Sequence, residues 1–358
     1  MTLLITGATG LVGQALVRHL LTQTPYAREP QKIRLLVRKR KRNPYREQFL
    51  SWCSQRGVEI FYGDLKKTMS IIGFTSVTDP EDSVLIHSGA IFNLWEPYEE
   101  LYTVNVQGTQ KILQAFEYHG LRKMIYVSSV AVYGSYDGQN GKAVTEEFPV
   151  TPSETLGYER TKAFGESLVK DYLQDHPDRL ITILRPAGII GGPGYTLDMF
   201  SRMLSTPYTP LPRGGLDKIS LVDVNDVARA IMFFTDYARG NGEAYNLVGT
   251  VTSIRDFVTS LGQALQKDDV RVFSIPLTLF RAGNLVAKVV RKFKRPQERS
   301  ILIPELFQNL GKDILIDGEK ITKLGFQYQV PMTESLARYG RFVMENPWYI
   351  EKKMGLAL

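Results

Sequence analysis

Short apolar runs alternate with longer amphipathic stretches through the first half of this 358-residue chain. The amphipathic stretches, at residues 11–22, 45–56, 98–119 and 158–175, have helical periodicity. Because strands that alternate with helices form βαβ units, the pattern predicts an α/β fold with a Rossmann-type, doubly wound parallel sheet. The apolar runs are nearly continuous, which is typical of strands covered on both faces. The runs expected to form these strands are Leu3–Thr6, Ile33–Val37, Val58–Tyr62, Val84–His87, Met124–Ser128 and Ile181–Arg185.

A glycine-rich turn follows the first expected strand, before the first expected helix. Gly7 permits a tight turn, Gly10 lets the backbone approach a pyrophosphate, and Gly13 lets the helix pack close to the sheet. The helix then points its free N–H groups at the anion. This context predicts a dinucleotide site, whereas an ordinary strand–helix loop is the alternative. The expected contacts are Thr6, Gly7, Thr9, Gly10, Leu11, Val12 and Gly13.

The second expected strand ends in Val37-Arg38-Lys39-Arg40, without a carboxylate. In NAD enzymes of this architecture, an Asp or Glu at this place binds the ribose hydroxyls. A carboxylate would repel a 2′-phosphate, whereas a guanidinium binds it through charge-assisted hydrogen bonds. We therefore expect NADP(H) as the cofactor, with Arg38 as the main phosphate contact and Lys39 as a weaker one. The alternative is a basic loop without a cofactor role.

After residue 186, prolines and glycines interrupt the alternation of expected strands and helices. Helical periodicity returns near residues 224–237 and 253–267. We predict an NADP-binding Rossmann core over residues 1–186, to which residues 220–250 return. Residues 187–358 are expected to form a smaller, mainly substrate-binding part.

Tyr158 and Lys162 lie four residues apart on an expected helix, so their side chains share one face. Reduction of a carbonyl needs a proton donor for the developing alkoxide, and a free tyrosine, with a pKa of about 10, is a sluggish one. A nearby ammonium stabilises the phenolate and lowers that pKa. The lysine can also hold the nicotinamide ribose. Ser129 is expected to bind the carbonyl oxygen, with Ser128 as the nearby alternative.

The spacing G-x-x-G-x-x-G resembles that of the extended short-chain dehydrogenase/reductase family, and further motifs follow in the family's order over about residues 1–250. These are Gly63-Asp64-Leu65, His87-Ser88-Gly89-Ala90, Asn105-Val106-Gln107-Gly108-Thr109, Ser128-Ser129-Val130-Ala131-Val132-Tyr133-Gly134, Tyr158-Glu159-Arg160-Thr161-Lys162, Arg185-Pro186 and Val222-Asp223-Val224-Asn225-Asp226-Val227. The resemblance implies that Ser129, Tyr158 and Lys162 are catalytic. It also implies cofactor contacts at Asp64, Leu65, Ser88, Gly89, Ala90, Asn105, Ser128, Tyr158, Lys162, Pro186, Gly188 and Ile189.

Composition narrows the class of protein. No apolar run reaches the roughly 18–20 residues that span a bilayer, and the N-terminus lacks a signal-peptide pattern, so we expect a soluble, cytoplasmic protein. Cys53 is the only cysteine and cannot form an intrachain disulfide. No pair of histidines has metal-ligand spacing, and no metal is expected. The net charge of +7 includes a basic cluster after residue 287, but no nucleic-acid partner is expected.

The expected substrate region is apolar and has few residues suited to gripping a sugar diphosphate. The segment from Ile275 to Phe326 resembles the 3β-hydroxysteroid dehydrogenase and 3-ketoacyl reductase branch of the family. We predict an NADP(H)-dependent reductase of a hydrophobic ketone, such as a 3-keto acyl, polyketide or sterol-like compound. A nucleotide-sugar epimerase or dehydratase, an acyl-thioester reductase and a non-enzymatic NADP sensor are the alternatives. Residues 277–295 combine an apolar stripe at helical spacing with a basic end. Three interpretations stay open: a helix packed on the core, a lid over the substrate whose basic end binds a carrier, and a peripheral membrane contact. A homodimer also stays open.

Overall fold

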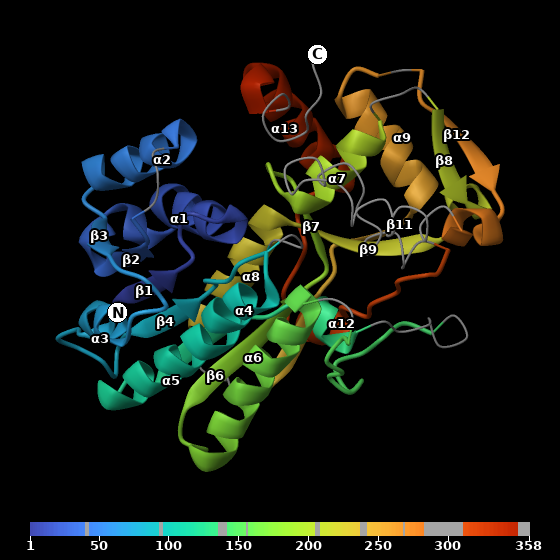
Figure 1. The fold of residues 1–358 in the computed structure, drawn as a ribbon. Coiled ribbons are helices and arrows are strands. Elements are labelled where there is room, and N and C mark those ends of the chain that lie inside the picture. Colours follow the sequence, from blue (N-terminus) through green and yellow to red (C-terminus); the bar gives the residue numbers. More distant parts are fainter. Residues whose placement is uncertain are drawn as a thin grey trace.

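The computed structural model describes residues 1–39, 43–92, 96–134, 142–154, 157–204, 208–236, 242–267, 269–282 and 311–349 (Figure 1). Its centre is a parallel sheet of seven strands in the order β10-β6-β5-β4-β1-β2-β3. The prediction of a doubly wound α/β fold is confirmed, and the six predicted strands are present with ends that move by at most one residue. The strands are β1 (Leu3–Thr6), β2 (Ile33–Val37), β3 (Glu59–Tyr62), β4 (Val84–His87), β5 (Lys123–Val127), β6 (Leu180–Pro186) and β10 (Ala244–Leu247).

The order of the strands reverses at β1. Strands β2 and β3 extend the sheet to one side of β1, whereas β4 to β6 extend it to the other. In open α/β sheets, ligands bind at the carboxyl ends of the strands that flank such a reversal. The ends of β1 and β4 are therefore where the fold itself predicts a ligand site.

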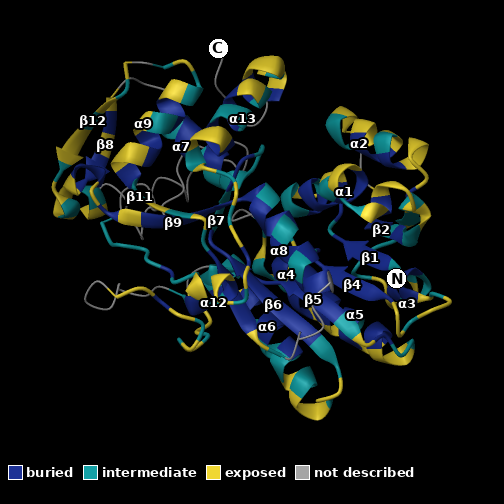
Figure 2. Cartoon of the chain, turned by 180° about the vertical axis from the view of Figure 1, so that it is seen from behind, coloured by how far each residue is buried: buried dark blue, intermediate teal, exposed yellow. Residues whose placement is uncertain are grey.

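Helices cover both faces of the sheet, and successive strand residues point to opposite faces. Leu3 and Ile5 pack under α1, α2 and α8, whereas Leu4 packs under α3, α5 and α6. All three side chains are fully buried, in agreement with the continuous apolar runs of the sequence (Figure 2). The helices are α1 (Leu11–Gln23), α2 (Pro44–Gln55), α3 (Thr68–Thr75), α5 (Gly108–Tyr118), α6 (Gly157–Asp175) and α8 (Val224–Asp236).

The helix predicted over residues 98–119 consists of three pieces. Helix α4 (Tyr98–Tyr102) leads through a π-helical turn, η3 (Thr103–Gln107), into α5. Asn105 is buried in the π turn. Such turns are rare and occur frequently at functional sites, and this one lies next to the end of β4.

A second lobe lies beyond the carboxyl ends of the strands (Figure 1). Its core joins α7, α9 and α13 to a small sheet of β7, β9 and β11. The predicted helix 253–267 is α9, which Ser253 caps by accepting a hydrogen bond from the backbone of Asp256. The elements are β7 (Gly188–Ile190), α7 (Tyr195–Met203), β8 (Tyr208–Pro212), β9 (Lys218–Asp223), β11 (Thr250–Ser253), α9 (Ile254–Ala264), β12 (Arg271–Ile275) and α13 (Met332–Glu345).

The predicted helix over residues 277–295 falls largely outside the described residues. Only 277–282 are described, and they are helical. Among the helices that the structure describes, none is both long enough and apolar enough to cross a membrane.

Candidate active site

The turn between β1 and α1 depends on glycine for two separate reasons. Gly7 has a φ of +71°, which L side chains rarely adopt, and a Cβ atom there would lie 2.6 Å from the carbonyl carbon of Ser88. A Cβ at Gly13 would lie 2.3 Å from the Gly7 carbonyl oxygen. Gly13 therefore packs against the turn itself rather than against the sheet, where the sequence had placed its contact.

The N-terminus of α1 is open at this turn. Gly10 is exposed and occupies the N-cap position, and no side chain caps the first turn of the helix. Leu11 and Val12 follow it half-buried, and Thr9 precedes it. Uncapped N–H groups at a helix N-terminus form a binding site for an anion. The open helix N-terminus and the glycine turn are thus the features that the sequence associated with a pyrophosphate.

Hydrogen bonds join the ends of β1 and β4. Ser88 Oγ donates to the Thr6 carbonyl oxygen (2.7 Å), and Thr6 Oγ1 accepts from the Gly89 backbone (3.0 Å). His87 is buried between Thr6 and Thr109 through its two ring nitrogens. Burial lowers the pKa of His87 to about 3, so the ring is neutral and serves packing rather than acid–base chemistry. Ala90 follows, exposed at the edge of the crevice.

Asn105 holds the segment that leaves β4. Its side chain accepts from the Ile91 backbone N–H (2.7 Å) and donates to the Ile91 carbonyl oxygen (3.0 Å) and to Thr161 Oγ1 (3.1 Å). Because Thr161 belongs to α6, this amide fixes the loop after β4 against the helix that carries Tyr158.

The residues expected near the adenosine lie at the ends of β2 and β3. Arg38 is half-buried and, within the described part of the chain, makes no hydrogen bond or ion pair. Lys39 is exposed, with its ammonium 5.6 Å from the centre of the Tyr62 ring. Asp64 Oδ1 accepts the backbone N–H of Lys66 (3.0 Å), and Leu65 is half-buried beside it. The guanidinium of Arg38 is therefore available to an anion.

Ser129 and Tyr158 meet at the carboxyl end of β5. The Ser129 hydroxyl lies near enough to the Tyr158 phenol to lower its pKa, and Ser129 Oγ accepts the backbone N–H of Ala131 (3.1 Å). Ser128 points elsewhere, because its hydroxyl donates to Glu166 Oε2 (2.7 Å). Of the two candidate serines, the geometry therefore brings Ser129 to the phenol.

Burial raises the pKa of Tyr158 above its ordinary value, and the Ser129 hydrogen bond only partly opposes this. Lys162 is buried on the same helix, but its ammonium donates to the Val127 carbonyl oxygen (2.9 Å) and lies 4.8 Å from the centre of the Tyr126 ring. Burial lowers the pKa of Lys162 to about 8. The lowering of the tyrosine pKa that the four-residue spacing predicted is thus not seen in this structure, because Lys162 contacts β5.

Two aromatic side chains, those of Phe92 and Tyr195, form a chain of ring contacts with Tyr158. The Phe92 ring lies edge-on to Tyr158, with centroids 4.4 Å apart, and edge-on to Tyr195 of α7, with centroids 4.6 Å apart. Phe92 keeps 46% of its surface exposed, so a substrate can reach it. The sequence interpretation missed Phe92. Its place just after the small residues that end β4 was the available signal.

The segment after β6 crosses the dinucleotide turn. Pro186 is buried at the end of β6, and Gly188 and Ile189 begin β7 half-buried. Cβ atoms at Gly192 and Gly194 would lie 2.9 and 2.8 Å from the Leu11 side chain. This glycine-rich segment closes one side of the crevice.

Comparison with known proteins agrees with the fold and the motifs. Residues 3–248 match the model of the "NAD dependent epimerase/dehydratase family", so the chain belongs to that family. It is a family of nicotinamide-dependent enzymes that includes oxidoreductases, dehydratases and epimerases.

Three relatives illustrate the range of proteins to which this chain is similar. "Sterol demethylase protein B" of Methylococcus capsulatus is 33% identical over 195 residues, which are 53% of this chain and 52% of that protein. The chain thus spans about half the length of that relative. A ketoreductase of Stigmatella aurantiaca that acts on a farnesylated dihydroquinoline oxide is 26% identical over 71% of this chain and 75% of its own. A polyketide synthase–nonribosomal peptide synthetase of Aspergillus flavipes is 29% identical over 64% of this chain but only 6% of its own length.

Among solved structures, the dTDP-glucose 4,6-dehydratase DesIV of Streptomyces venezuelae, with NAD bound, superposes with a TM-score of 0.71. The identity is 22%, and the match covers 97% of this chain and 98% of that one. At this identity the similarity concerns the fold.

Proposed function

We propose that this protein is an NADP(H)-dependent reductase that converts a ketone of a hydrophobic substrate to an alcohol. The observation that carries the proposal is the position of Tyr158 beside the exposed Phe92 ring and near Ser129, at the carboxyl end of β5. A bound NADPH supplies the hydride for the carbonyl carbon. The chain supplies a proton donor, an oxygen-binding hydroxyl and an apolar wall.

Tyr158 is the acid in this proposal. Its raised pKa keeps the phenol protonated at neutral pH, which is the form that donates a proton to a developing alkoxide. Ser129 Oγ lies near the phenol and binds the same substrate oxygen in this proposal. In this proposal Lys162 holds the nicotinamide ribose, and its charge favours alkoxide formation; its contact with the Val127 carbonyl oxygen at the end of β5 supports this role.

The cofactor preference rests on the end of β2. A half-buried guanidinium at Arg38 and an exposed ammonium at Lys39 suit a 2′-phosphate, and the segment after Val37 starts without a carboxylate. The hydrophobic substrate rests on Phe92 and Tyr195, and the ketoreductase among the relatives acts on a farnesylated compound.

An acyl-thioester reductase is the second candidate. The relative that favours it is the synthase–synthetase of Aspergillus flavipes, a class of assembly-line enzyme whose intermediates are thioesters. Reduction of a thioester releases a thiol, whereas reduction of a ketone releases none. An epimerase would differ from both, because it restores its cofactor in each turnover and consumes no NADPH.

The test is NADPH oxidation, followed by absorbance, with a panel of 3-keto acyl compounds, steroids, acyl thioesters and UDP-sugars. We expect turnover with a hydrophobic ketone and no thiol release. Tyr158→Phe should lower kcat about 10²-fold or more, because it removes the acid, and NADPH should still bind. Full activity of Tyr158→Phe would refute the assignment of the acid, and activity confined to UDP-sugars would refute the substrate class.

A further inference from the structure

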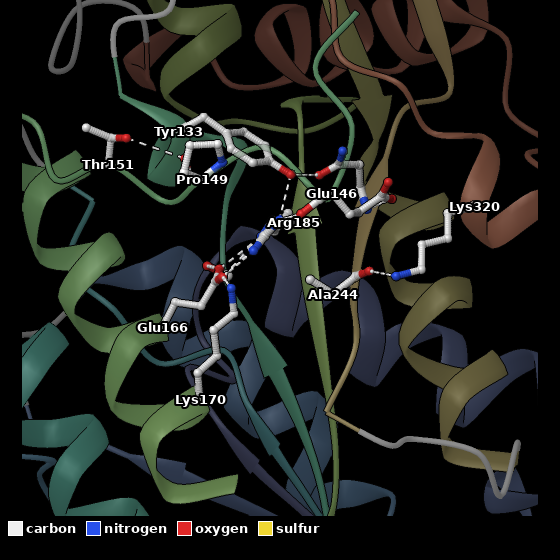
Figure 3. Close-up of polar contacts among 11 residues, drawn as sticks. Tyr133, Glu146, Pro149, Thr151, Glu166, Lys170, Arg185, Ala244 and Lys320 are labelled. Atoms are coloured by element: carbon white, nitrogen blue, oxygen red, sulfur yellow. Dashed lines mark hydrogen bonds and ion pairs between the residues drawn. The ribbon is translucent and has the colours of Figure 1, made fainter. Parts of the chain in front are cut away.

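A buried chain of polar side chains joins the segment after β5 to α6, β6 and β10. Figure 3 shows Glu166, Arg185 and Tyr133 of this chain. Glu166 and Arg185 lie at its centre, and both side chains are fully buried. Isolated charges at such depth are costly, and a buried ion pair is tolerated only when its hydrogen bonds are satisfied. This ion pair lies next to the segment that carries Ser129 of the candidate active site.

Glu166 anchors one end of the segment that carries Ser129. It accepts from Ser128 Oγ (2.7 Å), from Arg185 Nε (3.1 Å) and from Lys170 (3.1 Å), and it also pairs with Arg185 Nη2. Burial opposes ionisation of Glu166, but Arg185, Lys170 and Ser128 together hold its pKa below the ordinary value. The carboxylate is therefore charged, and the bond that it accepts from Ser128 is charge-assisted.

Arg185 anchors the other end. Its Nη1 donates to the Tyr133 hydroxyl (2.6 Å), which in turn donates to Asn246 Oδ1 (2.7 Å). Tyr133 ends the short 3-10 helix that begins at Val130, and Ser129 is the N-cap of that helix. The ion pair thus holds both flanks of Ser129, while Ser129 itself faces Tyr158.

We propose that Glu166 and Arg185 are positioning residues that fix Ser129 against Tyr158, and that Glu166 also keeps Lys162 charged. The proposal rests on the proposed function, because it assigns the pair to the same Ser129–Tyr158–Lys162 site. Glu166 lies one helical turn beyond Lys162, as Lys162 lies one turn beyond Tyr158, so one face of α6 carries all three groups.

The charges around Lys162 support the second half of the proposal. His87 faces it from β4 and is neutral, and Tyr126 faces it from β5 with a pKa that burial raises, so neither supplies a negative charge at neutral pH. Burial lowers the pKa of Lys162, and Glu166, on its own helix, opposes that lowering. The guanidinium of Arg185, on β6, forms an ion pair with Glu166. Removal of the carboxylate should therefore favour the neutral amine.

The first experiment uses Tyr133→Phe, which keeps every charge and removes one hydroxyl. We expect kcat to fall about tenfold, because the hydroxyl's bonds with Arg185 and Asn246 are lost and Ser129 is held less firmly, with NADPH affinity unchanged. The matched control is Tyr245→Phe, another buried tyrosine of the same region, whose side chain packs in the core under α8. Equal kcat in both variants would overturn the positioning role, whatever their melting temperatures.

The second experiment compares the pH dependence of kcat in Glu166→Gln and the parent. We expect the alkaline limb of the profile to move to lower pH, with kcat about tenfold below the parent at pH 8 and a smaller difference at pH 6. A uniform loss at every pH would indicate a structural role only and would overturn the claim about Lys162. If Glu166→Gln does not fold, as judged by circular dichroism, the Tyr133→Phe result decides the positioning role, and the claim about Lys162 is withdrawn.

Failure of this inference is distinguishable from failure of the proposed function. The parent protein and Tyr158→Phe establish the reductase activity first. If the parent turns over and Tyr158→Phe does not, an unchanged Tyr133→Phe contradicts only the positioning role.

Discussion

Replacement of Gly7 by alanine tests the most constrained point of the dinucleotide turn. Gly7 has a φ of +71°, and a Cβ there would lie 2.6 Å from both the carbonyl carbon and the carbonyl oxygen of Ser88. Real Cβ atoms do not approach backbone atoms so closely, and a backbone carbonyl cannot rotate away as a flexible side chain does. The end of β4 must therefore move away from β1.

Two costs add at this position. A left-handed conformation costs an alanine about 1–2 kcal/mol, and forcing a methyl group into a packed site costs about 1–3 kcal/mol more. We expect the free energy of unfolding to fall by roughly 2–5 kcal/mol. Because Ser88 and Gly89 are expected cofactor contacts, NADPH affinity should fall at least about tenfold, which corresponds to about 1.4 kcal/mol.

Gly120 provides a matched control. Its φ is +66°, but nothing lies within 4 Å of the position of its Cβ. Gly120→Ala should therefore show only the conformational cost of about 1–2 kcal/mol, with unchanged NADPH affinity. Denaturant unfolding and fluorescence titration with NADPH measure the two quantities. Equal losses in both variants, or normal NADPH binding by Gly7→Ala, would refute the close approach of β1 and β4 as the reason for glycine.

Three further predictions concern charge. Arg38→Asp should weaken NADPH binding about tenfold or more and narrow or reverse the preference over NADH; tighter NADH binding by the parent would contradict it. Burial raises the pKa of Glu159 to about 7, so the folded state binds its proton more tightly, and stability should decline as pH rises from about 4.5 to 7. Glu159→Gln should abolish that decline, as thermal melts at pH 5 and pH 8 can show. Lys292→Glu with Lys294→Glu should raise KM for the native substrate without affecting NADPH affinity, and salt-sensitive sedimentation of the parent with anionic vesicles would favour a membrane contact over a carrier contact.

The part of the fold that the sequence predicted is the part that local rules determine. The strand from Leu3 to Thr6 is apolar at its first three positions because both faces of the sheet are covered, and each of its side chains is buried as expected. Gly7 and Gly10 were interpretable because a turn between a strand and a helix makes specific backbone demands. Gly13 was interpreted less well, because its contact is with the preceding turn and not with the sheet, and sequence spacing does not distinguish the two.

The candidate acid–base pair shows the limit of spacing arguments. Residues four apart on a helix share a face, and Tyr158 and Lys162 do so. The direction of each polar group, however, depends on the partners available at the end of β5. The Lys162 ammonium donates to the Val127 carbonyl oxygen, and the Tyr158 phenol lies near the Ser129 hydroxyl. Only the arrangement of the strand ends, which the sequence does not specify, decides that Ser129 and not Ser128 completes the site.

The substrate side could not be predicted, because its contacts join residues far apart in the chain. Arg338 of α13 donates to the Gly191 carbonyl oxygen (2.6 Å) and pairs with Asp223, so the C-terminal helix holds the segment that crosses Leu11. A side chain at Gly191, where φ is +97°, would collide with that pair. No periodicity relates an arginine in one amphipathic helix to a glycine nearly 150 residues earlier. A motif can therefore identify the cofactor, whose contacts are local to strand ends, while the substrate depends on tertiary packing that must be determined in three dimensions.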